Sequence, residues 1–80
     1  MAEIVDVVLV DAGKNTTDVV LALREVTTKE PVVELMDLQM AKRRVDSTPC
    51  VVVPNVPLDA GDRIKERLEQ AGATVELKPA

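Results

Sequence analysis

The chain has no phenylalanine, tyrosine or tryptophan among its 80 residues, so valine, leucine, isoleucine, methionine and alanine must build its core. A domain of this length buries only about 60% of its unfolded surface, so its stability is marginal unless a cross-link reinforces it. A single cysteine cannot form an internal disulfide, and without histidine we expect neither a metal site nor a cofactor. The sequence therefore predicts one small domain over residues 1–80, held together by aliphatic packing.

The net charge of −4 limits the partners that the chain can attract. Nucleic acids and anionic membranes bind positively charged surfaces, and unpaired bases stack on aromatic side chains, which are missing here. No apolar run approaches the roughly 20 residues that cross a bilayer, and the N-terminus does not resemble a signal peptide. We expect a cytoplasmic protein that binds neither nucleic acid nor membrane.

The first third of the chain predicts a strand followed by a helix. Residues 4–10 are rich in β-branched side chains, and a turn at 11–15 leads into a helix from Thr16 to about Val26. Asn15 is a good N-cap, and Asp18 three residues later resembles a capping box. The helical period puts four apolar residues on the inner face: Val19, Ala22, Leu23 and Val26. The outer face carries Thr17, Leu21, Arg24 and Glu25.

A second helix is predicted from Pro31 to Asp46, but its apolar residues do not keep one phase. One face would carry Val32, Leu35, Met36 and Met40. Leu38, Ala41 and Val45 point roughly the opposite way. Either the helix breaks or bends near Asp37, or one straight helix has two apolar faces and needs two partners.

The last part of the chain predicts strand, helix and strand. Residues 50–53 form a short strand closed by Pro54, and a helix runs from 58 or 59 to Ala71 with Ile64 and Leu68 inward. Gly72 occupies the C′ position, and residues 74–78 alternate as a strand. The order β-α-α-β-α-β predicts an α+β domain of two layers, a three-stranded sheet with three helices on one face.

The sequence offers no catalytic constellation. Cys50 would have no histidine base, and we expect it to be a buried small hydrophobe. The glycine-bearing turn DAGKN at 11–15 has neither the P-loop nor the dinucleotide spacing. We therefore expect a protein without catalytic activity.

Four stretches of the chain carry a resemblance to a known family: DVVLVDAGKN at 6–15, VVLALREVT at 19–27, LQMAKRRVDSTP at 38–49 and NVPLDAGDRIKERLEQAGATVELK at 55–78. In this order they resemble the C-terminal domain of the bacterial ribosomal stalk protein, large-subunit ribosomal protein seven/twelve. The resemblance implies the same fold and a docking role without catalysis. In that family the domain recruits translation GTPases to the ribosome: elongation factors Tu and G, initiation factor two and release factor three.

The resemblance also implies a partner-binding face on the first two helices. Arg24 and Lys42 match the basic positions of the family's face, whereas Thr16, Thr17 and Leu21 stand where the family has lysine, valine and lysine. The implied partner-binding residues are Thr17, Leu21, Arg24 and Lys42. The loss of two positive charges should change the rate of association and the choice of partner more than it changes the affinity.

The chain also departs from the family between these helices, where residues 28–37 replace a glycine-rich turn with a gain of about seven residues. The family's N-terminal dimerisation domain and hinge have no counterpart, which predicts a free-standing paralogue. In the half of the second helix that matches the family, Leu38, Ala41 and Val45 should face the domain's own core. Val32, Leu35, Met36 and Met40 would then form an exposed apolar patch. A homodimer contact, a lid on the domain's own helices and a foreign partner are the three interpretations of this patch.

Two classes of function follow. The first is a protein interaction module that binds translation GTPases or another protein, as a homodimer. The alternative is an accessory protein or enzyme of a specialised pathway, such as peptide natural-product biosynthesis, that reuses the ribosomal fold.

Overall fold

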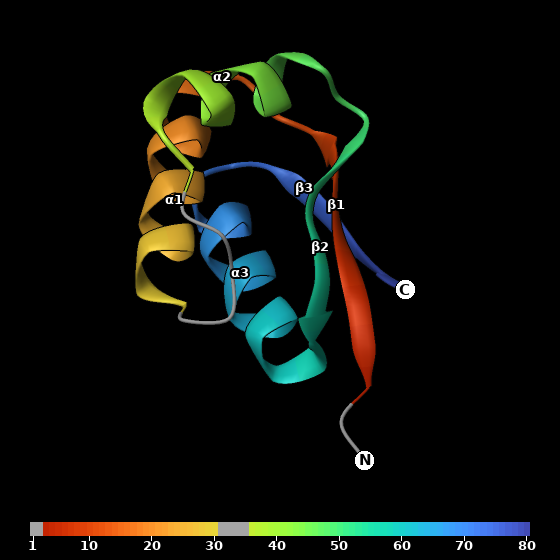
Figure 1. Ribbon diagram of the computed structural model, residues 1–80. Coiled ribbons are helices and arrows are strands. Elements are labelled where there is room, and N and C mark those ends of the chain that lie inside the picture. The colour runs from red at the N-terminus through yellow and green to blue at the C-terminus, as the bar shows by residue number, and fades with distance from the viewer. Residues whose placement is uncertain (1–2, 31–35) are drawn as a thin grey trace.

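The computed structural model describes residues 3–30 and 36–80 and has the predicted order β-α-α-β-α-β (Figure 1). The six elements are β1 (Ile4–Asp11), α1 (Thr16–Lys29), α2 (Leu38–Asp46), β2 (Cys50–Pro57), α3 (Leu58–Gln70) and β3 (Thr74–Pro79). The α+β fold class is thereby confirmed.

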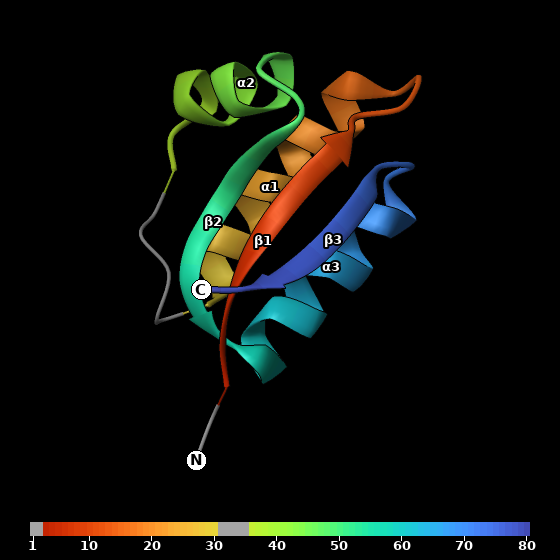
Figure 2. The same ribbon diagram turned by 90° about the vertical axis from the view of Figure 1, so that its right-hand side faces the viewer.

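The sheet has β1 at its centre, paired antiparallel with β2 on one side and β3 on the other. Alternate residues of β1 are buried, including Val5, Val7 and Leu9, because one face of the strand packs on the helices. Figure 2 shows the sheet in front of α1 and α3, while α2 lies across the end of the helical layer. The result is a two-layer domain with the helices on one side.

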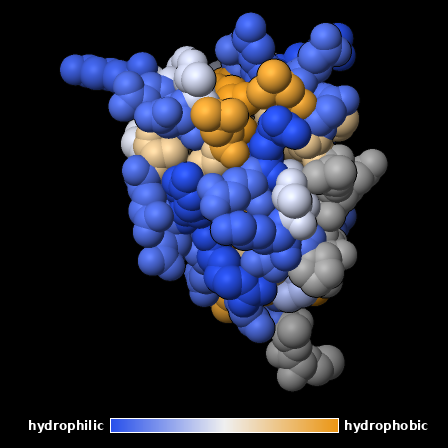
Figure 3. Space-filling model, turned by 90° about the vertical axis from the view of Figure 1, so that its left-hand side faces the viewer, coloured by the Kyte–Doolittle hydropathy of each residue, from blue (hydrophilic) through white to orange (hydrophobic). Residues whose placement is uncertain are grey.

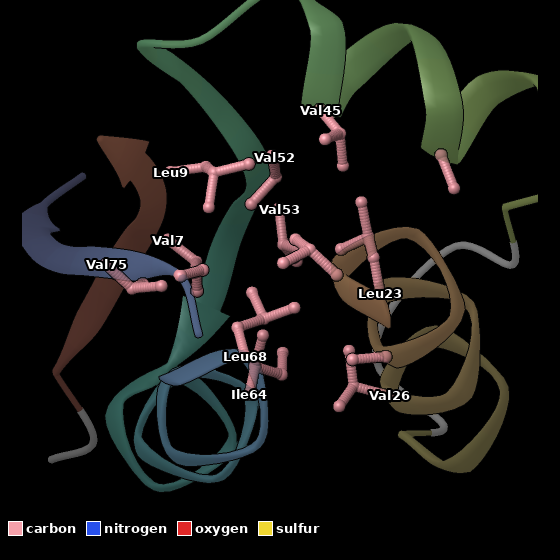
Figure 4. Close-up of a cluster of buried hydrophobic side chains, with 14 of the residues drawn as sticks. Val7, Leu9, Leu23, Val26, Val45, Val52, Val53, Ile64, Leu68 and Val75 are labelled. Carbon is pink, nitrogen blue, oxygen red and sulfur yellow. The ribbon is translucent and has the colours of Figure 1, made fainter. Parts of the chain in front are cut away.

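Aliphatic side chains from every element fill the space between the layers (Figure 4). Leu9 of β1, Leu23 of α1 and Ile64 and Leu68 of α3 have no exposed surface, and Val45 of α2 closes the upper end. Fully burying one such side chain stabilises the fold by about 1.5–3 kcal/mol. Packing of this kind replaces the aromatic residues that the sequence lacks.

Helix α1 buries the predicted stripe of Val19, Ala22, Leu23 and Val26. Its start differs from the prediction, because the side chain of Asn15 makes no capping hydrogen bond. It also runs three residues past Val26, to Lys29. The Thr28 hydroxyl donates to the Arg24 carbonyl at 2.8 Å within this added turn.

Helix α2 begins at Leu38, so the prediction of a helix through Met36 and Asp37 is wrong, as is the alternative of one straight helix with two apolar faces. A carboxylate oxygen of Asp37 accepts a hydrogen bond from the backbone N–H of Met40 at 2.8 Å. Asp37 is therefore an N-cap that starts a new helix, which confirms the predicted break at this residue. Residues 31–35 lie outside the described part of the chain.

Two side-chain placements around this break correct the sequence-based expectations. Met36, expected to point away from the domain, is only 6% exposed and packs in its core, while its N–H donates to the Thr27 hydroxyl at 3.5 Å. Leu38, expected in the core with Ala41 and Val45, is 51% exposed. Helical spacing predicts the wrong side for Met36 because the backbone there is not helical. Leu38 is exposed because it lies in the first turn of α2, which extends past the core.

Strand β2 continues past the predicted end at Pro54 to Pro57. Asn55 takes a positive φ of 55°, and its N–H donates to a carboxylate oxygen of Asp6 at 2.9 Å. The register with β1 shifts here, so the strand passes Pro54 through an irregularity instead of ending.

Two glycines meet where the β1–α1 turn touches the α3–β3 turn. Gly72 has a φ of 99° and follows a helix end in which the Ala73 N–H donates to the Leu68 carbonyl and the Gly72 N–H to that of Glu69. This is the Schellman pattern, which confirms the predicted C′ position. Gly13, with a φ of 73°, lies so close that a Cβ there would collide with the Gly72 carbonyl oxygen.

A candidate protein-docking groove

A groove of about 230 Å³ runs between α1 and α2. Its lining residues are Thr16, Thr17, Val20, Leu21, Leu38, Lys42 and Asp46. Figure 3 shows an apolar patch on this side of the molecule with hydrophilic surface around it.

The groove follows from the spacing of side chains on its two helices. Thr17 and Leu21 are four residues apart in α1, and Leu38, Lys42 and Asp46 are four apart in α2, so each set forms a row along its helix. Val20, only 7% exposed, connects the groove to the core. Leu21 and Leu38 are each 51% exposed and give the walls an apolar surface that water contacts.

Among the described residues that line the groove, only Lys42 and Asp46 carry a formal charge. Both are exposed residues of α2, one helical turn apart. Their charges cancel, so the groove itself carries no net formal charge. Its chemistry is that of an apolar contact site with one cation and one anion at its border.

The structure brings together Thr17, Leu21 and Lys42, three of the four residues that the resemblance implies for partner binding. Arg24 is an exposed residue of α1 that does not line the groove. Val20, Leu38 and Asp46 also line the groove and were not predicted as site residues. The signal that was overlooked is Asp37, because recognising it as an N-cap starts the helix at Leu38 and removes Leu38 from the core.

A second hollow, of about 170 Å³, lies between α1 and α3 and is bordered by ion pairs. Arg63 donates from Nε and Nη2 to the two carboxylate oxygens of Glu30, at 2.6 and 3.0 Å. Arg67 Nε donates to Glu25 at 3.0 Å, and Lys29 Nζ donates to the same carboxylate at 2.8 Å. The two arginine pairs fasten the end of α1 to α3, whereas Lys29 and Glu25 pair within α1.

The ion pairs lower the pKa values of both glutamates. Hydrogen bonds from Lys29 and Arg67 lower the pKa of Glu25, and the hydrogen bond from Arg63 lowers the pKa of Glu30. The neighbouring lysine and arginine side chains therefore keep both carboxylates in their charged form. We assign this cluster a structural role.

Cys50 is half-buried and packs against the core, close to the expectation from sequence. Its Sγ donates to the Arg44 carbonyl at 3.1 Å, and burial raises the pKa of the thiol. A raised pKa lowers the thiolate fraction, which is the reactive form. Residues 3–30 and 36–80 contain no cluster of three metal-ligating side chains, and no helix among them is long and apolar enough to cross a membrane.

The antiparallel sheet with its helices on one side, and the apolar groove between the first two of them, make the chain a small α+β domain with a candidate docking surface. The chain belongs to the ribosomal protein L7/L12 C-terminal domain family, whose sequence model matches residues 5–78.

Curated relatives support this membership. The chain is 42% identical over 73 residues to the large ribosomal subunit protein bL12 of Pseudomonas fluorescens (strain Pf0-1), a match that covers 91% of this chain and 54% of the relative. The bL12 proteins of Sulfurihydrogenibium sp. (strain YO3AOP1) and Aquifex aeolicus (strain VF5) are 41% and 40% identical, each over 91% of this chain and 52% of the relative. The chain thus spans about half the length of the curated relatives it matches.

Proposed function

We propose that this stalk-like chain is a non-catalytic interaction module that binds translation GTPases in the cytoplasm through the α1–α2 groove. The observation that carries the proposal is the position of the groove. It lies between the two helices where the family resemblance implies partner binding, and Thr17, Leu21 and Lys42 line it. Exposed apolar surface on a small domain commonly marks an interface.

The residues of the groove have distinct roles in this proposal. Leu21 and Leu38, both half-exposed, supply the apolar contact area, and Thr17 offers a hydroxyl beside it. Lys42 pairs with an acidic group of the partner at the border of the contact. Arg24 lies outside the groove on the same helix and acts at longer range, by steering the encounter.

Binding of purified elongation factors Tu and G, measured by calorimetry, tests the proposal. We expect Leu38→Asp to abolish measurable binding, because it places a charge in the apolar wall. Ile4→Asp is the matched control, since Ile4 is 45% exposed and is the first residue of β1. The beginning of β1, next to the N-terminus, lies away from α2 (Figure 1). Circular dichroism establishes that both variants fold. If neither factor binds the unmodified chain, the proposed function is wrong.

We further propose that two copies associate through the segment around residues 32–40. Of the four side chains expected at this contact, Met40 is 39% exposed on α2, which supports its part in an interface. Met36 belongs to the core of its own chain, so its role in this proposal is to hold the segment on the domain. Val32 and Leu35 lie outside the described residues.

A further inference from the structure

We infer that the free edge of β3 accepts an extended segment of another protein as a fourth, antiparallel strand, and that it favours a segment whose residues are in turn acidic, apolar and basic. Among the described residues, β3 has β1 as its only neighbour in the sheet (Figure 2). This site goes beyond the proposed function, because the groove has α2 as one of its walls and α2 packs on β2, at the other edge of the sheet.

The two edges of the sheet differ in what they offer to a further strand. On β2, Pro54 and Pro57 have no N–H, and the Val51 carbonyl already accepts a hydrogen bond from Arg44 Nη1 at 3.2 Å. The register of β2 also shifts along β1. Features of this kind protect an edge from added strands. From Val75 to Lys78, in contrast, β3 contains no proline and keeps one register with β1.

The backbone of β3 turns the polar groups of Val75 and Leu77 towards the free edge. The Ala80 N–H donates to the Ile4 carbonyl at 3.1 Å, so these two residues form a hydrogen-bonded pair. Bonded and non-bonded pairs alternate along an antiparallel ladder, and the register with β1 is constant from this pair back to Val75. Val75 and Leu77 are therefore in non-bonded pairs with β1, and each presents its N–H and its C=O to an added strand.

The side chains of β3 define which segment fits. Glu76 and Lys78 are exposed, and their ion pair at 3.9 Å joins two solvated groups that remain accessible to a partner. Leu77 between them is half-buried against the core. Opposite charges that face each other across two strands stabilise the pairing, and like charges weaken it. An antiparallel segment therefore fits best with an acidic residue opposite Lys78, an apolar residue opposite Leu77 and a basic residue opposite Glu76.

A second copy of β3 fits this edge less well than a foreign segment does. Its own residues Glu76, Leu77 and Lys78 are acidic, apolar and basic, so the charges would match. In that pairing, however, Pro79 of the second copy would lie opposite Val75 and could offer no N–H to its carbonyl. The loss would occur twice, because the contact would be symmetric. We therefore expect the segment to come from a different protein and to have no proline at the position opposite Val75.

Two designed peptides test the inference. One has the order acidic, valine, basic, valine between short neutral flanks, and the other exchanges the acidic and the basic residue. We expect the first to bind at least about fivefold more tightly, because two favourable charge pairs replace two like-charge pairs. In NMR spectra the amide signals of residues 74–78 should shift, and the Val75 and Leu77 amides should exchange more slowly with solvent. Signals of residues 16–21 and 38–46 should stay unchanged.

Methylation of the peptide backbone distinguishes strand addition from charge attraction alone. The first peptide should lose binding when it is N-methylated at the residue opposite Leu77, because that N–H would bond to β3. N-methylation at the residue opposite Glu76 is the matched control, since that N–H would point away from β3, and it should change the affinity less than about threefold. Equal affinities of the two methylated peptides would overturn the inference.

Glu76→Lys is the discriminating variant. Its control is Glu66→Lys, which makes the same change of charge at an exposed position of α3. We expect Glu76→Lys to remove the preference between the two peptides and Glu66→Lys to leave it unchanged, with circular dichroism to establish that both variants fold. The inference is overturned if neither peptide binds at millimolar concentration, or if both bind the unmodified chain equally. It is also overturned if rising concentration of the chain alone protects the Val75 and Leu77 amides, because a second copy would then occupy the edge.

Discussion

Glu30 is a single residue on which the end of α1 depends. It is buried although it is a glutamate, and both of its carboxylate oxygens accept hydrogen bonds from Arg63 of α3. Charged residues are seldom buried unless they are paired in this way. The pair therefore fixes the point at which the chain leaves α1.

We predict that Glu30→Gln destabilises the fold near neutral pH and that the difference from the unmodified chain shrinks in acid. Arg63 lowers the pKa of Glu30 in the folded state. The stabilisation is fully present above the unfolded pKa of glutamate and is lost as pH falls through the lower folded pKa. Urea unfolding at a series of pH values from neutral to acid measures this difference.

The control for this prediction is Glu66→Gln, because Glu66 is an exposed glutamate of the same helix as Arg63. We expect it to alter stability little at any of these pH values. A difference between Glu30→Gln and the unmodified chain that stays constant with pH would contradict the role of ionised Glu30.

Single residues differ in how far the sequence reveals them. The inner stripe of α1 and the exposed Leu21 could be predicted, because helical periodicity alone decides them. The places of Met36 and Leu38 could not, since both depend on where the next helix begins. Arg63 and Glu30 are 33 positions apart, and no local pattern links them.

Helix α2 is the element whose boundary decides the candidate site. Its N-cap, Asp37, follows the core residue Met36 and precedes Leu38, the first residue of the groove wall. The predicted start of this helix, Pro31, lies about two turns before the observed start at Leu38, and the same prediction put Leu38 in the core. The polar cap was visible in the sequence, but the apolar residues on either side of it suggested one longer helix.

We predict that Asp37→Ala destabilises the protein by about 1 kcal/mol, the usual cost of losing a side-chain N-cap. The amide of Met40 then loses its acceptor, and the first turn of α2 frays. Hydrogen exchange measured by NMR should show faster exchange at Met40. Asp37→Asn keeps a capping oxygen and serves as the control. Equal stability of the alanine and asparagine variants would show that the cap contributes little.

The whole molecule could be predicted in outline, because its element order and the alternation of buried residues follow from short-range patterns. The paths of the strands were harder, since β2 passes a proline with the help of the Asp6 carboxylate, which comes from another strand. The groove lies between two helices, so its shape depends on their packing and not on either sequence alone.

Association of two copies is a prediction at the scale of the whole molecule. We expect light scattering to give the mass of a dimer at high micromolar concentration, because each large apolar side chain that the contact fully buries contributes about 1.5–3 kcal/mol. Leu35→Asp and Met40→Asp should each return the mass of a monomer. Ile4→Asp, on exposed β1 surface, should remain a dimer. A monomeric unmodified chain at this concentration would refute the prediction.

The two attachments of α1 have a mechanical consequence. Its beginning follows the turn in which Gly13 abuts Gly72, and its end is tied to α3 through Glu25 and Glu30. Because both ends are held against α3 or the turn that follows it, α1 is the fixed wall of the groove. If the groove widens or narrows to fit a partner, we expect α2 to move.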